Sequence, residues 1–78
     1  MSITLLEYFK IILQKVSFNA RLFEKELKKA IGQLLKAEII DLKKWCYEIF
    51  GKKFRRILKS AFSSFTFRKL STVKVVNV

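Results

Sequence analysis

Apolar residues recur with the period of an α-helix along most of this chain, and that periodicity limits its fold more than any other feature. At about 100° per residue, the apolar side chains of four successive segments each gather on one face. We predict helices over residues 5–16, 20–35, 38–50 and 52–63. The sequence has no proline and the connections between these segments are short, so the pattern predicts an all-α domain, a small bundle of three to four helices.

The apolar stripes also predict which side chains form the core. They are Leu5, Leu6, Tyr8, Phe9, Ile12, Leu13 and Val16 in the first segment, and Phe23, Leu27, Ala30, Ile31, Leu34 and Leu35 in the second. In the third they are Ile39, Leu42, Trp45, Cys46, Ile49 and Phe50, and in the fourth Phe54, Ile57, Leu58, Ala61, Phe62 and Phe65. The stripe of the first segment covers roughly 160°, which is wide enough for a helix central to the core.

Local signals mark the first two helix starts. Thr4 and Glu7 form the T-x-x-E pattern of a capping box. Asn19 is a preferred N-cap residue, and Phe18 is placed to pack on Phe23 as a hydrophobic staple. In the second helix we also expect an ion pair of Glu24 with Lys28, four residues later.

The two glycines have different expected roles. A single helix continued through Gly51 would turn its apolar stripe by roughly a quarter turn, so we predict a break there, with Gly51 following the third helix. Gly32 costs the second helix about 1 kcal/mol relative to alanine. It either permits a close helix crossing or weakens the last turn.

The final segment of the chain has a different character. In residues 64–78, Thr and Val become common and apolar residues alternate with polar ones, a pattern of β-strands. No turn motif marks a hairpin, so a short strand pair, an extended arm packed on the bundle and a disordered basic tail remain open. We therefore divide the chain into a helical domain, residues 1–63, and a β-prone or disordered basic C-terminal extension, residues 64–78.

Catalytic and metal-binding patterns are absent from the sequence. There is no His and only one Cys, which removes an internal disulfide framework, zinc fingers, c-type haem attachment and His-based catalysis. Cys46 follows Trp45 on an inward stripe and is expected to be a small buried hydrophobe. Glu38 and Asp41 share a helix face, which favours a solvated or capping role over a metal site. We predict no enzyme activity, no catalytic or metal-ligating residue and no cofactor.

The sequence predicts no membrane-spanning segment. The longest run without a charge is eight residues, Ser60 to Phe67, whereas a spanning helix needs roughly 18. No basic residue precedes the first apolar run and no cleavage signal follows it. With its free Cys, the chain is expected to be cytoplasmic, or at most peripheral to a membrane.

Charge is distributed very unevenly along the chain. The formal net charge is +11. Positions 1–50 hold nine basic and six acidic residues, whereas positions 51–78 hold eight basic residues and no acid. A codon bias toward lysine is a competing account of the excess, but it does not explain where the cations lie. Such a charge favours an anionic partner.

The candidate contact residues follow from that distribution. They are Lys52, Lys53, Arg55, Arg56 and Lys59 on the fourth predicted helix, together with Arg68 and Lys69 beyond it. Cations near a helix N-terminus are disfavoured by the helix dipole, so a cluster retained there suggests an anionic ligand. Arginine also binds phosphate bidentately. Phe67, beside Arg68, is a candidate for stacking on unpaired bases, although core packing is as good an account of it.

Three hypotheses for function remain after these exclusions. The first is a non-enzymatic protein that binds the phosphate backbone of nucleic acid with low sequence specificity. The second is peripheral binding to an anionic membrane surface through the amphipathic helix 52–63, which needs the apolar side chains of that helix to reach lipid. The third is a protein-interaction subunit, in one form a homodimer, with an interface formed by some of the eight Phe residues and Trp45.

Overall fold

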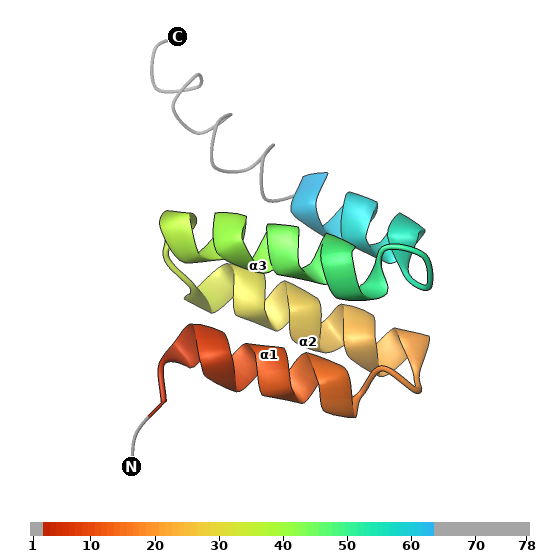
Figure 1. Cartoon of the computed structure of the whole chain (residues 1–78), viewed down its shortest axis with the longest axis horizontal. Helices are drawn as coiled ribbons and strands as arrows, with labels where there is room; N and C mark the ends of the chain where they lie inside the picture. Colours follow the sequence, from red (N-terminus) through yellow and green to blue (C-terminus); the bar gives the residue numbers. More distant parts are fainter. Residues whose placement is uncertain (1–2, 64–78) are drawn as a thin grey trace, which may run out of the picture.

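The computed structural model describes residues 3–63. It contains α1 (Leu5–Lys15), α2 (Ala20–Gln33), α3 (Lys36–Phe50) and a fourth helical segment over residues 55–63. Successive helices run in opposite directions and pack into a bundle (Figure 1). The prediction of a small all-α bundle is therefore confirmed, while the predicted extension 64–78 lies outside the described residues.

The first two helices begin as the capping signals predict. The Thr4 hydroxyl accepts a hydrogen bond from the Glu7 amide at 3.1 Å, and the Glu7 carboxylate accepts one from the Thr4 amide at 3.2 Å. The Asn19 side-chain oxygen accepts from the amides of Arg21 and Leu22 at 3.0 and 3.2 Å. These bonds satisfy amides that have no partner within the helix.

The predicted hydrophobic staple is wrong. Phe18 is 76% exposed, whereas Phe23 is fully buried. Phe23 instead packs against rings from other helices, at 4.9 Å from Phe50 and 4.3 Å from Phe54 between centroids. The ring contacts of Phe23 thus come from tertiary neighbours and not from a local staple.

The link between α2 and α3 has the predicted length of two residues but lies two residues earlier in the sequence than we predicted. Helix α2 ends two residues earlier and α3 begins two residues earlier, so that only Leu34 and Leu35 connect them. Both have extended backbones, and consecutive extended residues point in opposite directions. Leu34 is therefore buried, while Leu35, predicted to be inward, is 72% exposed. The Glu38 carboxylate accepts from the Leu35 amide at 2.9 Å, which confirms its capping role.

The predicted break at Gly51 is confirmed, but the next helix starts three residues later than we expected, at residue 55. Gly51 has helical backbone angles and its amide donates to the Tyr47 carbonyl at 3.1 Å. A β-carbon at this position would collide with that carbonyl oxygen. Around Gly32, by contrast, a β-carbon would meet nothing within 4 Å, which excludes a close helix crossing there.

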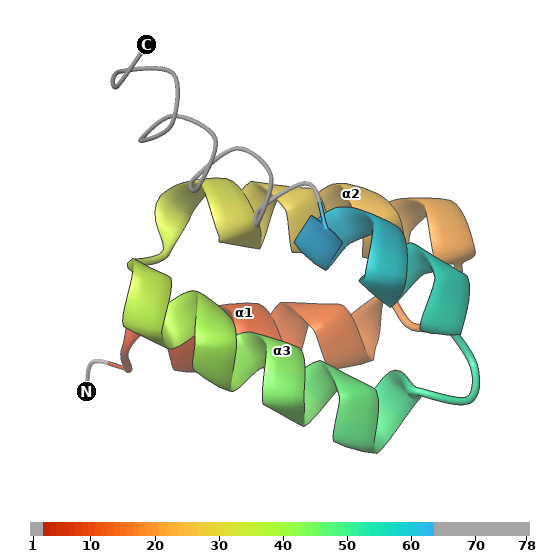
Figure 2. The same ribbon diagram turned by 90° about the horizontal axis from the view of Figure 1, so that it is seen from above.

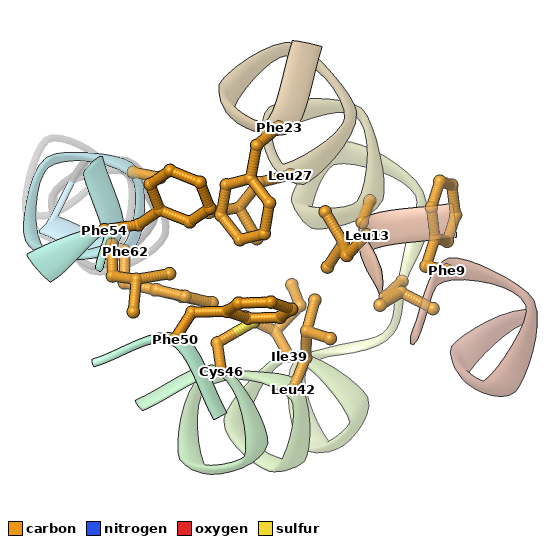
Figure 3. Close-up of a cluster of buried hydrophobic side chains, with 14 residues drawn as sticks. Phe9, Leu13, Phe23, Leu27, Ile39, Leu42, Cys46, Phe50, Phe54 and Phe62 are labelled. Carbon is orange, nitrogen blue, oxygen red and sulfur yellow. The ribbon is translucent and has the colours of Figure 1, made fainter. Parts of the chain in front are cut away.

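The four helices surround one apolar core. Seen from above and in the close-up of the core, α1 and residues 55–63 lie at opposite sides of the bundle, and α2 and α3 face each other between them (Figures 2 and 3). The fully buried large side chains come from all four helices: Phe9, Leu13, Phe23, Leu27, Ile39, Leu42, Cys46, Leu58 and Phe62. The predicted stripes supply every one of them.

Aromatic rings join three helices at one end of this core. Phe23 of α2 contacts Phe50 at the end of α3 and Phe54 just before residues 55–63, and the Phe50 and Phe54 centroids are 6.0 Å apart. The start of α2 therefore lies beside the start of the fourth helical segment, as Figure 3 shows. Three predicted inward positions are wrong, since 42%, 48% and 52% of the side chains of Leu5, Tyr8 and Ile49 are exposed.

Candidate anion-binding surface

The buried face of the fourth helical segment determines which side chains it presents to solvent. Phe54, Leu58, Ala61 and Phe62 are buried, and Ile57 packs against the core at its edge. The Leu58 amide donates to the Phe54 carbonyl at 2.9 Å, so Phe54 is continuous with the helix that follows. Residues at the intervening positions must then point outward.

Five of the predicted contact residues occupy those outward positions, and we call them the cationic face: Lys52, Lys53, Arg55, Arg56 and Lys59. All five are exposed. Lys52 and Lys53 lie in the turn before the helix rather than within it, while Arg55 and Arg56 form part of its first turn. The cations therefore still surround the positive end of a helix, where the dipole makes them unfavourable.

The cationic face contains no acid. The last carboxylate before it in the sequence is Glu48, and none follows. In the part of the chain that the structure describes, none of the five cations forms an ion pair. Packing requires a polar outer face but not a single sign of charge, so the core does not explain this arrangement.

Helix α2 shows what the same residue types do elsewhere in the bundle. Lys28 pairs with Glu24 at 3.3 Å, as we predicted, and Lys29 pairs with Glu26 at 3.7 Å. Both pairs lie at the surface, with exposed lysines and half-buried glutamates, and each contributes only a few tenths of a kcal/mol. They nevertheless reduce the positive field above α2, and no equivalent exists on the cationic face.

Lys53 is the cation that is most closely tied to the core. Its ammonium lies 5.2 Å from the centroid of the Phe54 ring, within the range of a cation–π contact. Phe54 is itself held against Phe23 and Phe50. This contact positions one charge over a rigid aromatic anchor.

One further cation, Arg21, belongs to the same end of the molecule and was missed by the sequence analysis. It is exposed in the first turn of α2, two residues before Phe23, and that turn also lacks an acidic residue. The contact of Phe23 with Phe54 places the starts of these two helices side by side. No local signal could reveal this neighbour, because the two segments are about thirty residues apart in the sequence.

The remaining predicted site residues, Arg68, Lys69 and Phe67, lie outside the described residues. Among residues 3–63, no three Cys, Asp or Glu side chains come together as a metal site would require. No helix in this range is long and apolar enough to cross a membrane.

Cys46 is buried at the centre of the bundle, as predicted. Its burial raises the pKa of the thiol to about 12, although the ammonium of Lys10 acts in the opposite direction. A thiol with this pKa is protonated at neutral pH and is a poor nucleophile. Lys10 also lies 5.6 Å from the centroid of the Trp45 ring, which places it against the contact of α1 with α3.

Comparisons with protein-family models, with curated proteins and with solved structures find no match to this chain.

Proposed function

We propose that this chain is a non-enzymatic protein that binds the phosphate backbone of nucleic acid through its cationic face, with low sequence specificity. The observation that carries the proposal is a cluster of five exposed cations without an acid among them or an ion pair to any described residue. Arginine and lysine contacts to phosphate provide most of the affinity of nonspecific nucleic-acid binding. Cytoplasmic location is part of the proposal, and the reduced thiol of Cys46 fits it.

The rigidity of the face supports this function. Its backbone is fixed by the buried side chains of Phe54, Leu58 and Phe62, so the backbone needs little ordering when a polyanion binds. The outward positions carry Lys, Arg and Ser but no Asn or Gln. Such a surface is suited to phosphates rather than to the edges of particular bases.

The burial of those side chains also favours nucleic acid over a membrane. An inserting amphipathic helix over residues 52–63 would need Phe54, Leu58 and Phe62 to contact lipid. All three are in the core, and releasing them would expose the aromatic contacts that join α2 and α3 to this helix. Binding of a phosphate backbone does not require these side chains to leave the core.

Titration of the full chain with short single-stranded and duplex oligonucleotides tests the proposal. We expect log K to fall linearly with log salt, by about 0.9 for each phosphate contacted on a duplex. Replacing both arginines of the face, Arg55→Glu with Arg56→Glu, should weaken binding at low salt by at least about tenfold, because two attractive charges become repulsive. Amide NMR shifts should move first at residues 52–59.

A second double variant separates the position of the charges from their total. Lys43→Glu with Lys44→Glu also removes two exposed, adjacent cations, but from α3. Each double variant lowers the formal net charge from +11 by four, to +7. If both weaken binding equally, or if the wild-type chain binds no oligonucleotide at low salt, the proposal is wrong. Binding to anionic vesicles that exceeds binding to oligonucleotides would instead establish the membrane hypothesis.

A further inference from the structure

The outer face of α1 carries apolar side chains that the bundle does not cover. Leu5, Tyr8 and Ile11 are 42%, 48% and 44% exposed, although Phe9 and Leu13 of the same helix are buried. At about 100° per residue, the three fall within an arc of about 120° on the solvent side. We call them the α1 apolar face. A contiguous exposed group of this kind is typical of an interaction surface.

The charges that flank this face are arranged so that it complements itself. Ile11 is halfway between Glu7 and Lys15, each four residues and about 6 Å away along the helix axis. All three residues are exposed. If a second α1 crosses antiparallel with Ile11 at the centre, each Glu7 lies opposite Lys15 of the partner subunit. One oxygen of Glu7 accepts from the Thr4 amide, and its other oxygen is left for that lysine.

The low net charge around α1 also allows a second copy to approach this face. Two chains of net charge +11 repel each other, and the repulsion is smallest where the facing surfaces are least charged. Residues 3–18 contain one acid and two cations, for a net charge of only +1. Helix α1 also lies at the opposite side of the bundle from the fourth helical segment, which carries most of the cationic face (Figures 1 and 3).

We propose that the α1 apolar face binds a second copy of this chain, with the two α1 helices antiparallel about a two-fold axis at Ile11. The contact would bury Ile11 and Tyr8 of both copies and form two equivalent ion pairs, as an isologous dimer requires. The cationic faces remain exposed at the two ends of the dimer. This interface differs from the one expected from the Phe residues, since Phe9, Phe23, Phe50, Phe54 and Phe62 are all buried within the monomer.

Sedimentation of the full chain tests the proposal. The dependence on salt concentration distinguishes self-association from binding of nucleic acid. Between about 10 μM and about 1 mM protein, we expect the mass to rise from monomer toward dimer, because a contact between single helices is small. Raising salt from about 50 mM to about 500 mM should strengthen association, since screening reduces the repulsion between the two net charges. Binding of a polyanion must change in the opposite direction.

A matched pair of substitutions locates the interface. Ile11→Lys places like charges together at the two-fold axis and should weaken association by at least about tenfold. Ile40→Lys makes the same change on α3, at a residue that is 55% exposed, and should leave association unchanged. Circular dichroism checks that both variants keep their helices. A wild-type chain that stays monomeric throughout, or association that Ile40→Lys abolishes and Ile11→Lys does not, overturns the proposal.

Lys15→Glu tests the interface independently, because general repulsion and the proposed ion pair predict opposite effects of this substitution on association. It lowers the net charge from +11 by two, to +9, so general repulsion alone would make association stronger. Loss of the ion pair with Glu7 of the partner subunit predicts that association becomes weaker. Stronger association of this variant would therefore contradict the interface centred on Ile11.

Discussion

The outer faces of α1 and of residues 52–59 lie on opposite sides of one core. They differ in polarity and in charge, but both are anchored by buried side chains. Each is carried by a segment whose inner residues pack in the core. The α1 face is apolar and nearly neutral, whereas the face at residues 52–59 is fully cationic. Burial of an inner stripe thus fixes the orientation of a helix and leaves its outer residues free to serve a different partner.

The strongest test of this comparison removes the buried ring of Phe54, which anchors the cationic face to the core. Phe54→Ala deletes a buried ring that contacts Phe23 and Phe50, so it should lower the free energy of unfolding by about 3 to 5 kcal/mol. A chain of this size has only about 4 to 12 kcal/mol of stability in total. Urea denaturation followed by circular dichroism measures the loss.

Phe18→Ala is the matched control for that variant. It deletes the same ring from an exposed position and should change stability by less than about 0.5 kcal/mol. Hydrogen exchange then tests whether both outer faces belong to one cooperative unit. Phe54→Ala could increase exchange only for the amides of residues 55–63 and leave those of α1 protected. The cationic face would then belong to a separate, less stable unit, and the two outer faces would not share one core.

The two glycines test how the cationic face is joined to α3. Gly51→Ala brings a β-carbon against the Tyr47 carbonyl oxygen and should cost about 1 to 3 kcal/mol, because backbone atoms must move. Gly32→Ala has open space around it within a helix and should stabilise the chain by about 0.5 to 1 kcal/mol. Thermal melting of the two variants measures both effects. Equal melting temperatures would show that the turn at Gly51 adapts to a side chain.

Much of the fold could be predicted from the sequence because helical period alone decides which residues share a face. The burial of Phe9, Leu27 and Leu58 could be predicted without knowing where the neighbouring helices lie. Residues at the edge of a stripe, such as Ile49, could not be placed in this way. Their burial depends on where the adjacent helix lies, and that is set by packing across the whole bundle.

The candidate site also contains residues that the sequence could place and residues that it could not. Exposure of Arg55 and Lys59 follows from the burial of Phe54 and Leu58 on the same segment, so the sequence was sufficient to predict it. That Arg21 lies at the same end of the bundle depends on a contact between Phe23 and Phe54, which no local pattern encodes. The start of the fourth helix was also predicted too early, because the chain uses Lys52 and Lys53 to reverse direction after α3.

The smallest expected effect comes from a change that keeps every charge on the cationic face. Arg55→Lys with Arg56→Lys removes only the bidentate geometry of the guanidinium group, so affinity for an oligonucleotide should fall by about two- to threefold. The slope of log K against log salt should not change, because the number of phosphates neutralised is the same. Fluorescence anisotropy across a salt series measures both quantities. The converse change on α3, Lys43→Arg with Lys44→Arg, should give no gain. A loss as large as that caused by Arg55→Glu with Arg56→Glu would mean that the face recognises phosphate by shape, and its difference from the α1 face would then be one of geometry as well as of charge.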